Sequence, residues 1–303
     1  MEYPPVVQQT SALADSFAGH PSTIRNFAFF SYRGDERLDT SDLSPRAWSD
    51  ALNSLAELAE PEEWTGAVPS ALPRPILDSY VRYTYQRLAM ENKIAVTEDG
   101  EYAAMNTGLL TTYAEDVFGL FQRNRSTRSN VQPWFFQRWA TESDRDIMRH
   151  FGTEPPMLAE YVTAAADLVY DWRRPLKLAY EHILGDNLDR FPPELAGMPS
   201  RARAALTHSV ELTLKRVRRN YKLVVPQWYP KLQEAGAQFL MPLDLTGSDS
   251  ADLALVVSQV GDSGYRGHTV LTLEMAYTNA RLVARPDSEW LKPQAPDLGP
   301  ADM

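Results

Sequence analysis

The fold class of this 303-residue chain is decided by residues 238–273, QFLMPLDLTGSDSADLALVVSQVGDSGYRGHTVLTL. Three apolar runs, at 238–245, 253–260 and 267–273, are separated by short polar segments, and the Gly-rich segment 261–264 is typical of a hairpin turn. Strands joined by such short turns pair antiparallel. The stretch therefore predicts a mainly antiparallel sheet, and the next residues, 274–283, fit a helix as well as a strand.

Helical patterns dominate the sequence closer to the N-terminus. The first predicted helix begins with Ser44 as N-cap and Pro45 in the first turn, and Pro61 ends it. Its apolar stripe is Trp48, Leu52, Leu55 and Ala59. A second helix is expected from Pro75, with the stripe Leu77, Val81, Tyr85 and Leu88.

A short hairpin is expected directly after these helices. Residues 94–96 and 102–104 flank a turn that contains Asp99-Gly100, a strong hairpin signal. Two helices followed by a hairpin have the order of a winged helix, and any small α+β unit has it as well. Strand-like, aromatic sequence then extends from Gly108 to Trp139.

The remaining patterns complete an α+β prediction. We expect a short helix at 144–151, a strand at 166–171, a helix at 176–191, and a long helix from Ser200. The long helix carries Leu206, Val210, Leu214, Val217 and Tyr221 on one face. Helices concentrate early and strands late, which favours α+β over a doubly wound α/β fold. The predicted division is a flexible arm at 1–25, a helical, winged-helix-like region at 26–110, an α+β core domain at 111–291 and a flexible tail at 292–303.

Composition excludes several classes of protein. The chain has no cysteine, which removes disulfide scaffolds, thiol nucleophiles and zinc ribbons. No apolar run approaches the roughly 18 residues of a membrane span, and no secretory signal opens the sequence. We therefore expect a cytoplasmic protein that has no membrane partner. The formal net charge of -10 argues against a surface that is basic all over. The sequence indicates no cofactor, no metal site and no particular oligomeric state.

Positive charge is nevertheless concentrated in one predicted helix. Residues 201–222 carry seven basic side chains against the single acid Glu211. Arg216, Arg218, Arg219 and Lys222 lie in its last turns and are candidates for contact with phosphates. Cations that complement the negative end of the helix dipole on a solvated face explain the same pattern.

A second basic stretch is interleaved with aromatic residues. Residues 121–139 contain no acid, and Arg123, Arg125 and Arg128 could form a second phosphate clamp. Trp134 and Phe136 could provide a surface on which unpaired bases stack. Burial of these aromatic residues in a core is the alternative.

Enzyme signatures are sparse. The chain has no Walker-type loop, no dinucleotide fingerprint and no His-Glu-x-x-His helix. His182 is the candidate acid–base residue, because Asp186 lies one helical turn away. A second set of polar side chains could converge on a pocket for a nucleotide or form the satisfied polar network of a core. This set is Asn220, Gln227, Tyr277, Asn279 and Arg281.

Several motifs together resemble a known family. They are Phe27-Ala-Phe-Phe30, Gln132-Pro-Trp-Phe-Phe136, Asn187-Leu-Asp-Arg-Phe-Pro192, Arg216-Val-Arg-Arg-Asn-Tyr-Lys222 and Glu274-Met-Ala-Tyr-Thr-Asn-Ala-Arg-Leu282. Over residues 26–291 the chain resembles a family of unknown function that is similar to the domain associated with OST-HTH (LOTUS) domains. The resemblance implies RNA binding and transfers no catalytic residue. The chain shows neither a LOTUS domain nor an acidic nuclease domain.

The leading hypothesis is therefore a protein that binds RNA or single-stranded nucleic acid. The alternatives are an enzyme that acts on a nucleotide or another phosphate-bearing small molecule with His182 as acid–base, and a protein–protein interaction module.

Overall fold

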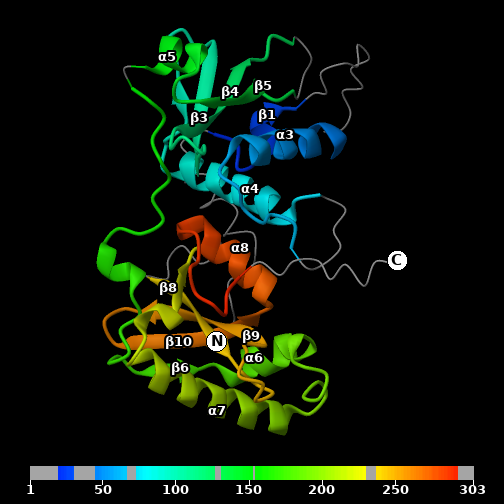
Figure 1. The fold of residues 1–303 in the computed structure, drawn as a ribbon, viewed down its shortest axis with the longest axis vertical. Coiled ribbons are helices and arrows are strands. Elements are labelled where there is room, and N and C mark those ends of the chain that lie inside the picture. Colours follow the sequence, from blue (N-terminus) through cyan, green and yellow to red (C-terminus); the bar gives the residue numbers. More distant parts are fainter. Residues whose placement is uncertain are drawn as a thin grey trace, which may run out of the picture. The chain divides into compact units, whose positions relative to one another are not determined.

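The computed structural model describes residues 20–30, 45–66, 73–126, 131–152, 154–229 and 237–292. The chain forms two compact units, Met1–Glu160 and Tyr161–Met303, drawn as a ribbon in Figure 1. Ser44 and Arg128 lie outside the described residues, as do most of the expected arm and tail. Each unit contains one five-stranded mixed sheet, so the expected α+β class is confirmed.

The first unit contains α2 (Ile24–Phe27), β1 (Ala28–Phe29), α3 (Pro45–Leu58), α4 (Pro75–Met90), β2 (Ala95–Val96), β3 (Tyr102–Leu110), β4 (Asp116–Arg123), β5 (Trp134–Thr141) and α5 (Arg145–Phe151). Its strand order is β1-β5-β4-β3-β2, and only the β1–β5 pair is parallel. The predicted stripes of the two long helices are buried, because apolar residues at helical spacing meet one face of the sheet. α5 packs on the opposite face through Ile147 and Phe151.

The expected hairpin forms, with Gly100 in the left-handed conformation at φ +68°. No winged helix is identified in the described part of this unit, because the hairpin strands β2 and β3 are the edge of the five-stranded sheet. The expected boundary at residue 110 falls between β3 and β4, which pair antiparallel in that sheet. Gly119 on β4 lets the sheet pack tightly, since a Cβ there would lie 3.0 Å from the Trp139 ring.

The second unit contains β6 (Leu176–Leu178), α6 (Tyr180–Asn187), α7 (Pro199–Val217), β7 (Val225–Gln227), β8 (Gln238–Leu243), β9 (Leu253–Val260), β10 (Gly264–Leu271) and α8 (Leu273–Val283). Three short 3₁₀ helices accompany them: η1 (Ala165–Leu168), η2 (Leu188–Arg190) and η3 (Tyr221–Leu223). The strand order is β6-β10-β9-β8-β7, antiparallel except for β6 with β10. The sheet predicted from residues 238–273 is therefore confirmed.

Helices cover both faces of this second sheet (Figure 1). α6 and α7 bury Ile183, Leu206 and Val210 against strand residues such as Phe239 and Leu255. α8 contacts β7, β9 and β10. The predicted stripe of α7 is buried at Leu206, Val210 and Val217 and half-buried at Leu214, whereas Tyr221 lies past the end of the helix and is exposed. The charged side chains of α7 are exposed on its other faces.

Two predictions in this unit were wrong. Residues 166–171 form no strand, because the Asp167 carboxylate accepts hydrogen bonds from the Ala164 N–H and the Thr163 hydroxyl, which favours the local turn η1. The helix expected at 176–191 begins only at Tyr180, since residues 176–178 pair with β10 as the parallel strand β6. Residues 274–283, which fitted either element, are helical, and the Thr272 hydroxyl caps the helix by accepting from the Met275 N–H.

Candidate functional site

The basic end of α7 contains cations in two different electrostatic situations. Arg216 lies 3.6 Å from the Asp249 carboxylate, and Lys222 Nζ lies 2.9 Å from the carboxylate of Asp287. The hydrogen bond between Lys222 and Asp287 raises the pKa of the amine and lowers the pKa of the carboxyl group. Arg219 donates instead to the Lys215 carbonyl at 2.8 Å and so satisfies a backbone acceptor at the end of the helix. These contacts neutralise part of the charge that the sequence concentrates here.

Arg218 has a different partner, the indole of Trp172. Its guanidinium carbon lies 5.0 Å from the ring centroid, and that of Arg173 lies 5.5 Å from the same centroid. In the described part of the chain, neither guanidinium group forms an ion pair with a carboxylate, although the backbone N–H of Arg173 donates to Asp171 at 3.1 Å. Trp172 is 38% exposed in the turn before β6. A partly exposed aromatic ring with two cations close to it combines the groups that stack an unpaired base and hold its phosphates.

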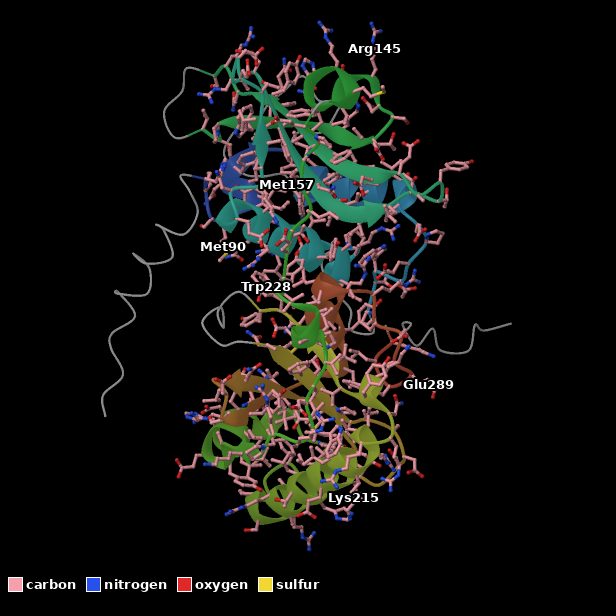
Figure 2. All side chains as sticks on the ribbon, turned by 90° about the vertical axis from the view of Figure 1, so that its left-hand side faces the viewer. Met90, Arg145, Met157, Lys215, Trp228 and Glu289 are labelled. Atoms are coloured by element: carbon pink, nitrogen blue, oxygen red, sulfur yellow. The ribbon has the colours of Figure 1, made fainter. Side chains whose placement is uncertain are left out.

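This indole and its two arginines are hereafter called the Trp172 platform (Trp172, Arg173 and Arg218), and other exposed groups lie on η3 and α7. Tyr221 of η3 is 59% exposed and lines a small pocket of about 150 Å³ with Leu168 of η1. Lys215 is exposed on α7 (Figure 2). The end of α7 and the residues that follow it therefore carry further exposed aromatic and basic side chains.

A larger pocket, with a volume of about 710 Å³, is lined by residues that follow Arg218 closely in the sequence. Asn220 and Lys222 line it from the end of α7, and Asp249 and Asp287 line it from two other segments. Trp290 completes one wall, where its Nε1 donates to the Leu223 carbonyl at 2.8 Å. Basic, acidic, amide and aromatic groups thus surround one concave space.

The arginine-rich segment of the first unit is less available to a ligand. Arg125 lies 2.6 Å from Glu101, and their hydrogen bond raises the pKa of Arg125. Arg123 lies 5.6 Å from the centroid of Trp134, and Arg128 is outside the described residues. The two basic stretches belong to different units of the chain.

The two aromatic residues expected to stack bases are packed inside the first unit. Trp134 is 5% exposed and lies 6.0 Å, centroid to centroid, from Phe27. Phe136 is half-buried and stacks on Phe30 at 4.7 Å. Their faces are therefore occupied by neighbouring rings, which is the alternative that the sequence left open.

Comparison with protein families identifies the chain. The family model described as Domain of unknown function (DUF3825) matches residues 55–290. The chain belongs to this family. No curated protein and no solved structure matches it. Membership of the DUF3825 family shows no link to OST-HTH domains and no ligand. The function of the site therefore has to follow from the chemistry of its own residues.

In this DUF3825 chain, His182 is exposed on α6 and lies 3.4 Å from Asp186. The partly buried His268 forms a 2.9 Å hydrogen bond with the buried Ser258 hydroxyl. Burial lowers the pKa of His268, and the charges of Arg266 and His182 lower it further. An acid–base role for His182 would be favoured by a shared cleft with Asn220, Tyr277 and Arg281. Of these residues, only Asn220 lines one of the two pockets described above.

The remaining polar candidates are parts of the packed interior. Gln227 is buried and accepts a 3.2 Å hydrogen bond from Asn279 Nδ2, which joins β7 to α8. Tyr277 is buried in α8, and Arg281 is half-buried one turn further on. These residues fit the satisfied polar network more closely than a ligand pocket.

Trp172 and Arg173 are the site residues that the sequence interpretation missed. They occur in Asp171-Trp-Arg-Arg-Pro175, a tryptophan beside two arginines in a segment that lacks helical or strand periodicity. That combination indicates an exposed turn, and it is the signal from which the site could be predicted. The described ranges contain no cluster of three or more metal-ligating side chains and no helix able to span a membrane.

Proposed function

We propose that this protein binds single-stranded RNA, or single-stranded nucleic acid more generally, through the end of α7 in its second unit. The observation that carries the proposal is the Trp172 platform, an exposed indole flanked by the guanidinium groups of Arg173 and Arg218. A base would stack on the indole, and the two cations would hold the adjacent phosphates. The resemblance to an RNA-associated family supports the same ligand.

Complementation of the helix dipole explains only some of these charges. It accounts for Lys215, in the last turn of α7, and for Arg219, which donates to a backbone carbonyl there. It does not account for Arg173, because this residue lies outside α7, next to Trp172 in the turn before β6. Two segments that are distant in sequence thus bring cations to one aromatic ring, which favours a binding surface.

A net charge of -10 is compatible with this proposal. Acidic residues elsewhere repel nucleic acid from the rest of the surface, so attraction is confined to the basic end of α7. The expected mode of binding is therefore a short single-stranded segment on a focused site.

A fluorescence-anisotropy titration of the full chain with a short unstructured RNA tests the proposal. Affinity should fall as salt rises, with a slope of about 0.7 per phosphate contact in a plot of log affinity against log salt. A DNA strand of the same sequence measures the contribution of the 2′-hydroxyl groups. The absence of binding to both strands at low salt would exclude the proposed function.

A further inference from the structure

The large pocket lined by Asn220 and Lys222 has a composition that indicates a second ligand group. Arg218 contacts Trp172, and Asn220 and Lys222, two and four residues further along, line the pocket. A strand whose base stacks on Trp172 could therefore place its next group in the pocket. This inference rests on the proposed function and adds to it.

The donors of the pocket suit a phosphate. Lys222 and Lys292 supply ammonium groups, and Asn220 supplies an amide. The side-chain Oδ1 of Asn220 accepts a hydrogen bond from the backbone N–H of Lys222 at 3.2 Å. Within the described residues, the side-chain Nδ2 of Asn220 forms no hydrogen bond and can donate to a ligand. Charge-assisted hydrogen bonds from such donors are among the strongest that a phosphate can accept.

Three carboxylates also line the pocket, those of Asp249, Asp287 and Glu289, and a phosphate must compete with them for the cations. Asp287 pairs with Lys222 inside the pocket, where the two side chains are 71% and 57% exposed, and Asp249 faces Arg216 at its rim. Exposed ion pairs of this kind contribute little free energy, so a ligand can replace them. The incoming group must nevertheless compete with a full negative charge.

That competition distinguishes two kinds of phosphate. A phosphodiester inside a strand has one negative charge, the same as the carboxylate that it would displace. A phosphomonoester carries a charge of about −1.5 to −2 at pH 7 and has three strong acceptor oxygens. A phosphomonoester therefore attracts Lys222 more strongly than the Asp287 carboxylate does, whereas an internal phosphodiester has no advantage in charge over that carboxylate.

The size and the wall of the pocket indicate what accompanies the phosphate. Its volume of about 710 Å³ is within the range of about 300–1,000 Å³ that is usual for small-molecule sites. The indole of Trp290 lines it, held by the hydrogen bond to Leu223, and Ser288 donates to the Lys222 carbonyl at 2.8 Å. A rigid aromatic wall of this kind suits a nucleoside better than it suits an inorganic ion.

We propose that this pocket binds a phosphomonoester on a nucleoside, as the phosphorylated end of the RNA strand or as a free mononucleotide. Asp287 and Asp249 act as competitors that keep internal phosphates out. Lys222 exchanges Asp287 for the terminal phosphate when the ligand enters.

Competition against a longer labelled RNA tests this proposal with the full chain. The unlabelled competitors are one pentanucleotide with a 5′-phosphate, with a 3′-phosphate or with hydroxyl groups at both ends. One phosphorylated form should compete about five- to tenfold more tightly than the hydroxyl form at pH 7.5. The difference should shrink at pH 5.5, because the second pKa of a phosphomonoester is about 6. Equal competition by all three forms would overturn the proposal.

Substitutions separate the pocket from general electrostatic attraction. Lys222→Gln should abolish the preference for a phosphorylated end, and Asp287→Asn should reduce it, because internal phosphates can then reach Lys222 without displacing a carboxylate. Lys177→Gln on β6 removes the same charge from another exposed position and should leave the preference intact. Equal losses in Lys222→Gln and Lys177→Gln would contradict a specific role of the pocket.

Further competition experiments distinguish the phosphorylated strand end from a free mononucleotide and also test the proposed function. If adenosine monophosphate competes as well as the phosphorylated strand, also with the Trp172→Ala variant, the pocket binds free nucleotides. Inorganic phosphate that competes equally well would overturn the nucleoside part of the proposal. Binding of the hydroxyl-ended RNA with no preference for a phosphate would overturn the pocket and leave the proposed function standing.

Discussion

The guanidinium carbon of Arg218 lies 5.0 Å from the ring centroid of Trp172, and this contact joins the end of α7 to the turn before β6. The first unit contains the same pair of residue types, Arg123 at 5.6 Å from Trp134. Trp134 is 5% exposed, whereas Trp172 is 38% exposed. Because Trp172 is the more exposed of the two rings, the pair of Trp172 and Arg218 is the better candidate for contact with a base.

Trp172→Ala is expected to weaken RNA binding about 5- to 100-fold, since stacking on an aromatic ring contributes about 1–3 kcal/mol per base. The slope of affinity against salt should stay unchanged, because no charge is removed. Tyr113→Ala, at an 89% exposed aromatic residue in the first unit, is the matched control. Anisotropy titrations at several salt concentrations measure both quantities, and an equal effect of the two substitutions would contradict the proposed platform.

Arg218→Gln should weaken RNA binding and also reduce the salt slope by about 0.7, the contribution of one phosphate contact on a single strand. Arg145→Gln on α5 of the first unit removes the same charge from an exposed position and should leave the slope unchanged (Figure 2). A loss of affinity at constant slope would show that Arg218 supports the Trp172 ring without touching a phosphate.

The elements that could be predicted from sequence are those stabilised by their own periodicity. The stripes of α3 and α4 fix which face of each helix is buried, and residues 238–271 alternate strand and turn in a pattern that only a sheet satisfies. β6 escaped prediction because its three residues are extended only through pairing with β10, about ninety residues later. Such a non-local contact leaves no local pattern.

The sequence predicts the positive charge of the candidate site but not which of its side chains are paired or exposed. The excess of cations at the end of α7 is visible in the sequence, but which of them are paired depends on acids from remote segments. Asp287 is 65 residues away from its partner Lys222 in sequence. Trp134 and Phe136 have the composition of a stacking surface, yet neighbouring rings from residues 27–30 bury or occupy their faces. Exposure, which decides function here, is a tertiary property.

The first unit should depend on a buried hydrogen bond between its two long helices. The Trp48 Nε1 donates to Asp78 Oδ1 at 2.6 Å, and both residues are buried. Asp78→Ala leaves the indole N–H without its acceptor and should lower the free energy of unfolding by about 1–3 kcal/mol. Urea unfolding measures this loss. Asp50→Ala, at an exposed position of α3, is the control and should stay within about 0.5 kcal/mol of wild type. Equal stability of the two variants would contradict the role of this bond.

Stability of the second unit should fall in mildly acidic solution because of His268. Burial and the neighbouring charges of Arg266 and His182 lower the pKa of His268 below its usual value of 6.5. As pH falls below about 6.5, the unfolded chain therefore binds a proton before the folded chain does, and the free energy of unfolding decreases. The loss should continue until the pH passes the lowered pKa of the folded state.

His268→Gln should reduce this decrease between pH 7.5 and pH 5.5, because the amide can still bond to Ser258 and does not titrate. Urea unfolding at several pH values measures the change. The pKa of His20 in the first unit is also lowered by burial, so part of the pH dependence should remain in the variant. His208→Gln, at an exposed position of α7, is the matched control. If wild type and His268→Gln lose the same free energy over this range, protonation of His268 does not limit the stability of the fold.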